Sequence, residues 1–175
     1  MTTCLLVIDV QWGMFQGLKV PKVWNDEHLL ARILTLIERA RATKTRVVYV
    51  QHAGEPHELL SAGSPAFALH PAIVPAADEP VVVKRRPNAF VGTSLHEVLR
   101  GMAIDHILAC GIQTEACVDS TCRAAADLGY EVTLVSDAHS TWDNKTLKAP
   151  QIIAHHNATL KDYDFVQLST TDDVR

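Results

Sequence analysis

The stretch Ile107-Leu108-Ala109-Cys110-Gly111-Ile112-Gln113-Thr114-Glu115-Ala116-Cys117, residues 107–117, joins a buried strand to the start of a helix. Its first four residues form a continuous apolar run, which is typical of a strand covered on both faces of a parallel sheet. Gly111 ends this strand, and Thr114 can cap a helix that continues to Ala126. A strand followed at once by a helix is the repeating unit of α/β domains, so this stretch predicts that class.

The same alternation runs outward in both directions along the chain. Short apolar runs predict further strands at residues 4–8, 46–50, 81–83, 132–135 and 165–168. Helical spacing and capping signals predict helices after Asn25, after Ser94 with Glu97, and from Pro150 onward, covering residues 26–40, 95–102 and 151–161. Residues 51–80 hold several Gly and Pro residues without a clear period, which is typical of a functional or disordered loop. The pattern predicts one α/β domain over residues 1–175 with right-handed crossovers.

Composition excludes several classes of partner. The 175 residues carry sixteen Lys and Arg against twenty Asp and Glu, a net charge of −4, so we expect neither a nucleic-acid nor a membrane surface. No apolar run approaches the ~20 residues of a membrane span. The first residues lack the pattern of a signal peptide, so we expect a cytoplasmic protein with reduced thiols. The four cysteines form no C-x-x-C pair, which argues against zinc ribbons and thioredoxins.

Three predicted strands end in residues that carry chemistry. Asp9 follows the first strand, Lys84 the third, and Cys117 lies near the start of the helix after the fourth. Carboxyl ends of parallel strands meet at one edge of a sheet, where ligands bind. The helix N-terminus favours a thiolate at Cys117, with Asp9 as its base and Lys84 as the orienting cation. The alternatives are a helix-capping Asp9, a solvated Lys84 and a Cys117 that only packs in its helix.

Four segments of the chain resemble a known family, the isochorismatase-like cysteine hydrolases. They are Leu6-Val7-Ile8-Asp9-Val10-Gln11, Val83-Lys84 with Asn88-Ala89-Phe90-Val91-Gly92-Thr93, residues 111–118, and Ser136-Asp137-Ala138. The resemblance runs from about residue 4 to residue 168. It implies a three-layer, Rossmann-like α/β domain. The sheet would have six mostly parallel strands in the order 3-2-1-4-5-6, with helices on both faces.

The resemblance also implies a site and a reaction. Asp9, Lys84 and Cys117 would form a catalytic triad, and a cis peptide between Ile112 and Gln113 would turn the Gln113 N–H inward. That N–H and the Cys117 N–H would form an oxyanion hole. The implied reaction is hydrolysis of a small-molecule amide or other C–N bond through a thioester on Cys117. Members of the family are usually dimers or tetramers, so we expect a homodimer or homotetramer.

Two other activities within the family stay open as alternatives. Nicotinamidases bind a divalent metal through an Asp-x-His motif after the second strand, where this chain has Gln51 in place of the Asp. We therefore expect no metal and no cofactor, although His52, His57 and His70 could still ligate zinc. True isochorismatases cleave a vinyl ether without a cysteine nucleophile, and a non-catalytic member would use the same pocket for binding only.

Aromatic residues near the predicted strand ends suggest a substrate pocket. Trp12, Phe15 and Phe90, together with His52, are our candidates for lining it, and ordinary packing is the alternative for each aromatic ring. A dinucleotide-binding module is a more distant alternative, because no G-x-G-x-x-G follows the first strand.

Overall fold

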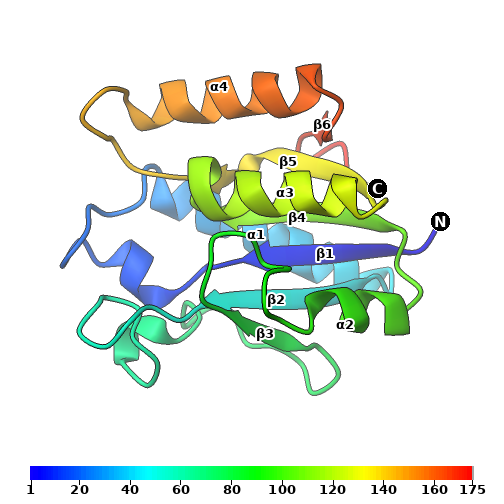
Figure 1. The fold of residues 1–175 in the computed structure, drawn as a ribbon, viewed down its shortest axis with the longest axis horizontal. Helices are drawn as coiled ribbons and strands as arrows, with labels where there is room; N and C mark the ends of the chain where they lie inside the picture. The colour runs from blue at the N-terminus through cyan, green and yellow to red at the C-terminus, as the bar shows by residue number, and fades with distance from the viewer. Residues whose placement is uncertain (175) are drawn as a thin grey trace.

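The computed structural model describes residues 1–174 and contains one six-stranded sheet (Figure 1). All neighbouring strands are parallel, and their order is β3-β2-β1-β4-β5-β6, which confirms the order that the family resemblance implied. The strands are β1 Thr3–Ile8, β2 Arg46–His52, β3 Val81–Lys84, β4 His106–Ile112, β5 Glu131–Ser140 and β6 Gln167–Ser169. Each predicted strand therefore exists, with ends shifted by up to five residues.

Helices cover both faces of the sheet. They are α1 Asp26–Ala42, α2 Leu95–Gly101, α3 Asp119–Asp127 and α4 Ala149–Asp162, with short turns η1 Trp12–Phe15, η2 Pro65–Phe67 and η3 Thr114–Val118. α1 places Ile33 and Ile37 in the core on one face, and Leu99, Cys122 and Leu160 from the other three helices lie in the core on the opposite face. Figure 1 shows α2 and α3 in front of the sheet and α1 behind it. No helix within residues 1–174 is long and apolar enough to cross a membrane.

The helix starts lie where they were predicted, but the predicted caps are wrong. Asn25 precedes α1 in a left-handed conformation, with φ 52°, and its side chain makes no capping hydrogen bond. Ser94 makes none either, and the Leu95 N–H instead donates to Thr93 Oγ1 at 3.2 Å. The predicted helix from Thr114 begins as the π-helical turn η3 and becomes α-helical only at Asp119. Several short polar side chains can cap a helix, so the sequence pattern predicts where a helix begins better than which side chain caps it.

β5 is longer than the sequence indicated, because the strand contains an irregularity. Leu134 pairs with Ala109 and His139 pairs with Gly111, so β5 advances further than β4 over this interval. The extra residues form a bulge that interrupts the apolar run after residue 135. Beyond the bulge, Ser140 pairs with Ile112. The end of β5 therefore places polar side chains beside the end of β4, just before η3, the turn that contains Cys117.

Two buried amide side chains organise the long loop after β2. Gln11 donates from Nε2 to the carbonyl oxygens of His52 and Phe67, at 3.0 and 2.7 Å. Gln51 donates from its own Nε2 to the same Phe67 oxygen at 2.9 Å. These bonds satisfy backbone groups that a buried loop would otherwise leave unpaired. The segment is thus ordered where it passes the ends of β1 and β2.

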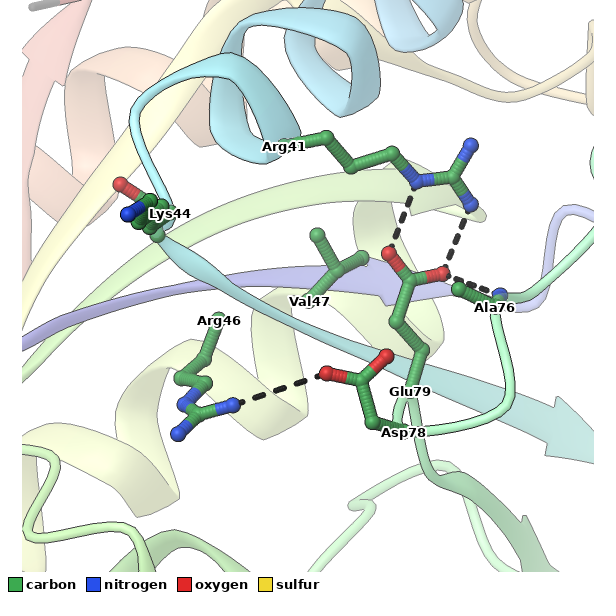
Figure 2. A pocket seen from close by; sticks show the side chains of 8 residues that line it. Arg41, Lys44, Arg46, Val47, Ala76, Asp78 and Glu79 are labelled. Atoms are coloured by element: carbon green, nitrogen blue, oxygen red, sulfur yellow. Dashed lines mark hydrogen bonds and ion pairs between the residues drawn. The ribbon is translucent and has the colours of Figure 1, made fainter.

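An ion pair fixes the other end of this loop, where the chain returns to β3. Arg41 on α1 donates to both carboxylate oxygens of Glu79, at 2.8 and 2.7 Å, as Figure 2 shows. The Tyr49 hydroxyl donates to Glu79 Oε2 at 3.1 Å, and the Ala76 N–H donates to the same oxygen at 2.8 Å. Bidentate Arg–carboxylate contacts are geometrically specific. This ion pair therefore holds the chain in place just before β3 begins.

Candidate active site

Asp9, Lys84 and Cys117 meet at the carboxyl edge of the sheet, as their positions predicted. Asp9 follows β1 directly, Lys84 is the last residue of β3, and Cys117 lies in η3 beyond β4. The Lys84 ammonium lies 2.7 Å from Asp9 Oδ2 and donates to Cys117 Sγ at 3.1 Å. The side chains of Lys84 and Asp9 are fully buried. Lys84 is therefore not the solvated strand-end charge that was the alternative reading.

A glycine permits the close approach of β4 to β1 just before the site. Gly111 has φ 131°, and a Cβ there would collide with the carbonyl oxygen of Ile8. Only glycine both adopts this positive φ readily and lacks a Cβ that would meet the Ile8 carbonyl. The next residue along β1, Asp9, has φ 52°, a conformation that non-glycine residues adopt mainly at functional sites. The two strands thus present Asp9 and the start of the Cys117 turn side by side.

The backbone around Gln113 leaves a hydrogen-bond donor free beside Cys117. The peptide bond between Ile112 and Gln113 is cis, as the family resemblance implied. The Gln113 carbonyl accepts bonds from the N–H groups of Ala116 and Val118, at 3.2 and 3.0 Å. The Gln113 N–H donates to no acceptor within residues 1–174. First-turn N–H groups lack partners inside the helix, so this donor is available to a ligand.

Burial sets the protonation of the site. It raises the pKa of Asp9, and the neighbouring Lys84 ammonium opposes that shift. Burial and the negative charge of Asp9 raise the pKa of Cys117 to about 12, although Lys84 again opposes the shift. This direction favours a thiol, whereas the helix N-terminus alone favours a thiolate.

A cavity of about 410 Å³ opens beside this cluster. His52 and Gln113 line it, and Lys19 and Glu58 are its charged residues. The remaining walls are Met14, Val20, Gly54, Leu59, Leu60 and Trp142. Among the residues that line this cavity, sequence reasoning predicted only His52, as a substrate contact, and Gln113, as an oxyanion-hole donor. The others come from loops and turns whose path no periodic pattern reveals.

The three aromatic residues proposed for the pocket have packing partners elsewhere. Trp12 and Phe15 both contact the His70 ring, with centroids 5.2 and 4.7 Å apart. Phe90 stacks on Tyr130 at 6.1 Å. None of the three lines the cavity beside Cys117. The structure thus places these rings in the packing arrangement that was their alternative.

The site does not fit a divalent metal. Ligand atoms of Asp9, His52 and Cys117 lie within 4.8 Å of one another, the only such group of three or more among residues 1–174. The Lys84 Nζ, however, lies 2.7, 3.2 and 3.1 Å from those same side chains. A metal ion at this point would meet a second cation, which repels it. The ammonium takes the place that a metal would need.

The loop histidines do not supply another metal site. His57 is exposed, and its carbonyl oxygen accepts a bond from Lys19. His70 lies between two aromatic rings, and its Nδ1 accepts from the Ala72 N–H at 3.2 Å. Gln51, which stands where metal-binding relatives have Asp, donates from its amide to the loop backbone instead of accepting from a metal.

Comparison with known proteins agrees with this geometry. The family model described as "Isochorismatase domain" matches residues 3–171. The chain belongs to the isochorismatase family. Isochorismatase family protein YddQ of Bacillus subtilis is 32% identical over 143 residues, which cover 81% of this chain and 79% of that protein. An isochorismatase structure from Pseudomonas putida superimposes with a TM-score of 0.93 at 30% identity, over 99% of this chain and 90% of that one.

A larger protein with a named activity also matches. Streptothricin hydrolase of Streptomyces noursei is 35% identical over 139 residues, which make up 79% of this chain and 50% of that protein. The chain therefore spans about half the length of this curated relative.

Proposed function

We propose that this isochorismatase-family chain hydrolyses an amide or other C–N bond of a small molecule through a thioester on Cys117. The observation that carries the proposal is the Lys84 ammonium, which contacts both Asp9 and Cys117 in a buried site. A nucleophile, a base and an orienting cation within contact distance are the elements of covalent catalysis. The streptothricin hydrolase that matches this chain supports hydrolysis as the reaction class.

The first step transfers the thiol proton as the carbon–sulfur bond forms. Asp9 Oδ1 is buried and accepts no hydrogen bond from the described residues, so it can take the proton of Cys117. Sulfur attacks the carbonyl carbon, and the carbonyl oxygen becomes an oxyanion. The N–H groups of Gln113 and Cys117 stabilise this charge, which preorganised donors do more effectively than water.

The second step uses the same proton. Protonated Asp9 donates it to the leaving amine, the C–N bond breaks, and a thioester remains on Cys117. Asp9 then takes a proton from water as the water oxygen attacks the thioester. The C–S bond breaks, the acid leaves, and Asp9 returns the proton to the Cys117 sulfur. Because burial raises the pKa of Asp9, the carboxyl can hold a proton between the two transfers. Lys84 keeps its charge and orients Asp9 throughout.

Intact-protein mass spectrometry of acid-quenched reactions tests this proposal. Small primary amides and ureido compounds serve as the panel, and an accepted substrate should add its acyl mass to the protein. Cys117→Ala should lose both the adduct and turnover. Cys122→Ala is the matched control, because Cys122 is buried in the core away from the cavity. Turnover above a few per cent in Cys117→Ala would exclude the thioester route.

A further inference from the structure

The Lys84 ammonium has three acceptors around it, and the third has no role in the reaction above. Besides Asp9 and Cys117, Lys84 Nζ lies 3.2 Å from His52 Nδ1. An ammonium carries three N–H donors and no lone pair. Lys84 therefore forms an ion pair with Asp9 and donates to the other two neighbours, so His52 Nδ1 is an acceptor. A neutral imidazole with an accepting Nδ1 carries its proton on Nε2.

Two observations make this ring a fixed, neutral donor. Burial and the Lys84 charge lower the pKa of His52, although Asp9 and Glu58 oppose the shift. Gln11 holds the backbone of His52 from both sides, because its Oε1 accepts from the His52 N–H at 2.8 Å and its Nε2 donates to the carbonyl at 3.0 Å. The ring cannot turn without losing the Lys84 contact.

The Nε2–H of this ring has no acceptor within residues 1–174. His52 Nε2 makes no hydrogen bond with any of these residues, and the atom is not among the buried polar atoms without a partner. His52 lines the same cavity as Gln113, whose other walls are mostly apolar. The unpartnered donor therefore belongs to a residue that lines this cavity together with Gln113, the proposed oxyanion-hole donor.

We propose that His52 Nε2–H selects substrates that carry a second acceptor oxygen beyond the scissile carbonyl. The scissile oxygen occupies the Gln113 and Cys117 N–H groups, so a different oxygen must satisfy His52. An apolar group against this donor would leave a buried N–H unpaired, and sites built around one hydrogen bond reject analogues that lack it. This proposal rests on the proposed function for the identity of the bond that is cleaved. The assignment of His52 Nε2–H as a donor does not depend on that function.

The tautomer can be measured directly by NMR of ¹⁵N-histidine-labelled Cys117→Ala protein, which binds without turnover. Two-bond ¹H–¹⁵N correlations should show a neutral Nε2–H ring for His52, with His52→Leu assigning the signal. His139 is the internal reference for an Nε2–H ring, because its Nε2 lies 2.8 Å from Asn157 Oδ1, which can only accept. Its Nδ1 contacts Thr114 Oγ1. An imidazolium or an Nδ1–H tautomer at His52 at neutral pH would overturn the proposal.

Ligand selection is tested by titrating the same protein with malonamide and with butyramide, in which an ethyl group replaces the second carboxamide group of malonamide. Malonamide should shift the His52 Nε2–H signal and bind roughly ten-fold more tightly than butyramide, with the His139 signal unmoved. His52→Leu should abolish the preference, and His52→Gln, which keeps an N–H donor, should retain part of it. Equal binding of the two amides, or binding of neither, contradicts the proposal.

These outcomes are separable from failure of the proposed function. If malonamide shifts His52 but the wild-type enzyme forms no Cys117 adduct with any amide, the donor assignment stands and the hydrolysis does not. If adducts form but the two amides bind alike, the hydrolysis stands and His52 is only a partner of Lys84.

Discussion

Replacing Lys84 by Met removes the cation that the site is built around. The Lys84 side chain is fully buried, 2.7 Å from an equally buried Asp9 carboxylate. Removing one partner of a buried ion pair leaves the other charge without compensation, which costs ~3–5 kcal/mol. Asp9 can escape this cost by taking a proton, at a price of about 1.4 kcal/mol per pH unit above the ordinary Asp pKa of about 3.9. Protonation of Asp9 therefore limits the loss in the free energy of unfolding to about 4 kcal/mol at pH 7.

This limit gives the loss of stability a definite pH dependence. Folded Lys84→Met holds a proton on Asp9 that the unfolded chain releases above its ordinary pKa. Its stability should therefore fall as pH rises, by about 3 kcal/mol between pH 5 and pH 7. Urea unfolding at the two pH values measures this difference. Of the two pH values, pH 5 is the one at which Lys84→Met should be closer to wild type in stability.

Catalysis should suffer independently of stability. A protonated Asp9 cannot accept the Cys117 proton, so we expect kcat/KM to fall at least ~100-fold, or about 2.7 kcal/mol of transition-state stabilisation. Alkylation of Cys117 should also slow, because neither an ionised Asp9 nor the Lys84 cation is then available to assist loss of the thiol proton. Lys84→Arg should rescue poorly, since a planar guanidinium does not replace a compact ammonium.

The control for Lys84→Met is Lys148→Met. Lys148 pairs with Asp143 at 2.8 Å, but the two side chains are 74% and 45% exposed. Exposed pairs contribute little, so neither stability nor turnover should change measurably. The pH profile of Cys117 alkylation, measured by mass spectrometry, is the deciding assay. Superimposable profiles in wild type and Lys84→Met, with near-normal turnover, would refute the reasoning.

Three further predictions follow from the geometry. Gly111→Ala should cost roughly 4 kcal/mol in urea unfolding, because its Cβ meets the Ile8 carbonyl and its φ is positive; Gly101→Ala, with open space around it, should not destabilise the protein. Burial lowers the pKa of His139 to about 4, so its contribution to stability is complete above pH 6.5 and is lost as pH falls toward 4. Wild type should lose about 2 kcal/mol from this group between pH 7.5 and pH 5, and His139→Gln should remove that slope. Exhaustive chelation should leave turnover unchanged, because the Lys84 ammonium fills the space between the ligand atoms; stoichiometric metal in elemental analysis, lost together with activity, would contradict this.

The strands and the three central residues could be predicted from the sequence for one physical reason. Strands buried on both faces need continuous apolar runs, so their ends are visible in the sequence. Parallel pairing then brings those ends to one edge, and Asp9, Lys84 and Cys117 follow without any knowledge of side-chain geometry. The cis peptide before Gln113 and the strand order came only from the family resemblance.

The cavity could not be predicted because its walls depend on long-range contacts. Trp142 follows the part of β5 that lies beyond the bulge, and a bulge leaves no periodic signal. Met14 belongs to a short turn whose position depends on hydrogen bonds to a loop distant in the sequence. The raised pKa of Cys117 was not predicted for a related reason. The dipole of a helix start is local and visible in sequence, whereas desolvation depends on everything packed around the sulfur.

The strand order explains why the central cation is a lysine. β2 lies between β1 and β3, so Asp9 and Lys84 are separated by two strand spacings, about 9–10 Å. An extended lysine stem of four carbons reaches about 6 Å from its Cα, and the Asp9 side chain covers most of the remainder. The lysine must also pass the end of β2, where His52 is its register partner. The contact between Lys84 and His52 is therefore a consequence of the topology that makes the Asp9 contact possible, and any shorter residue at position 84 would leave Asp9, Cys117 and His52 without their shared donor.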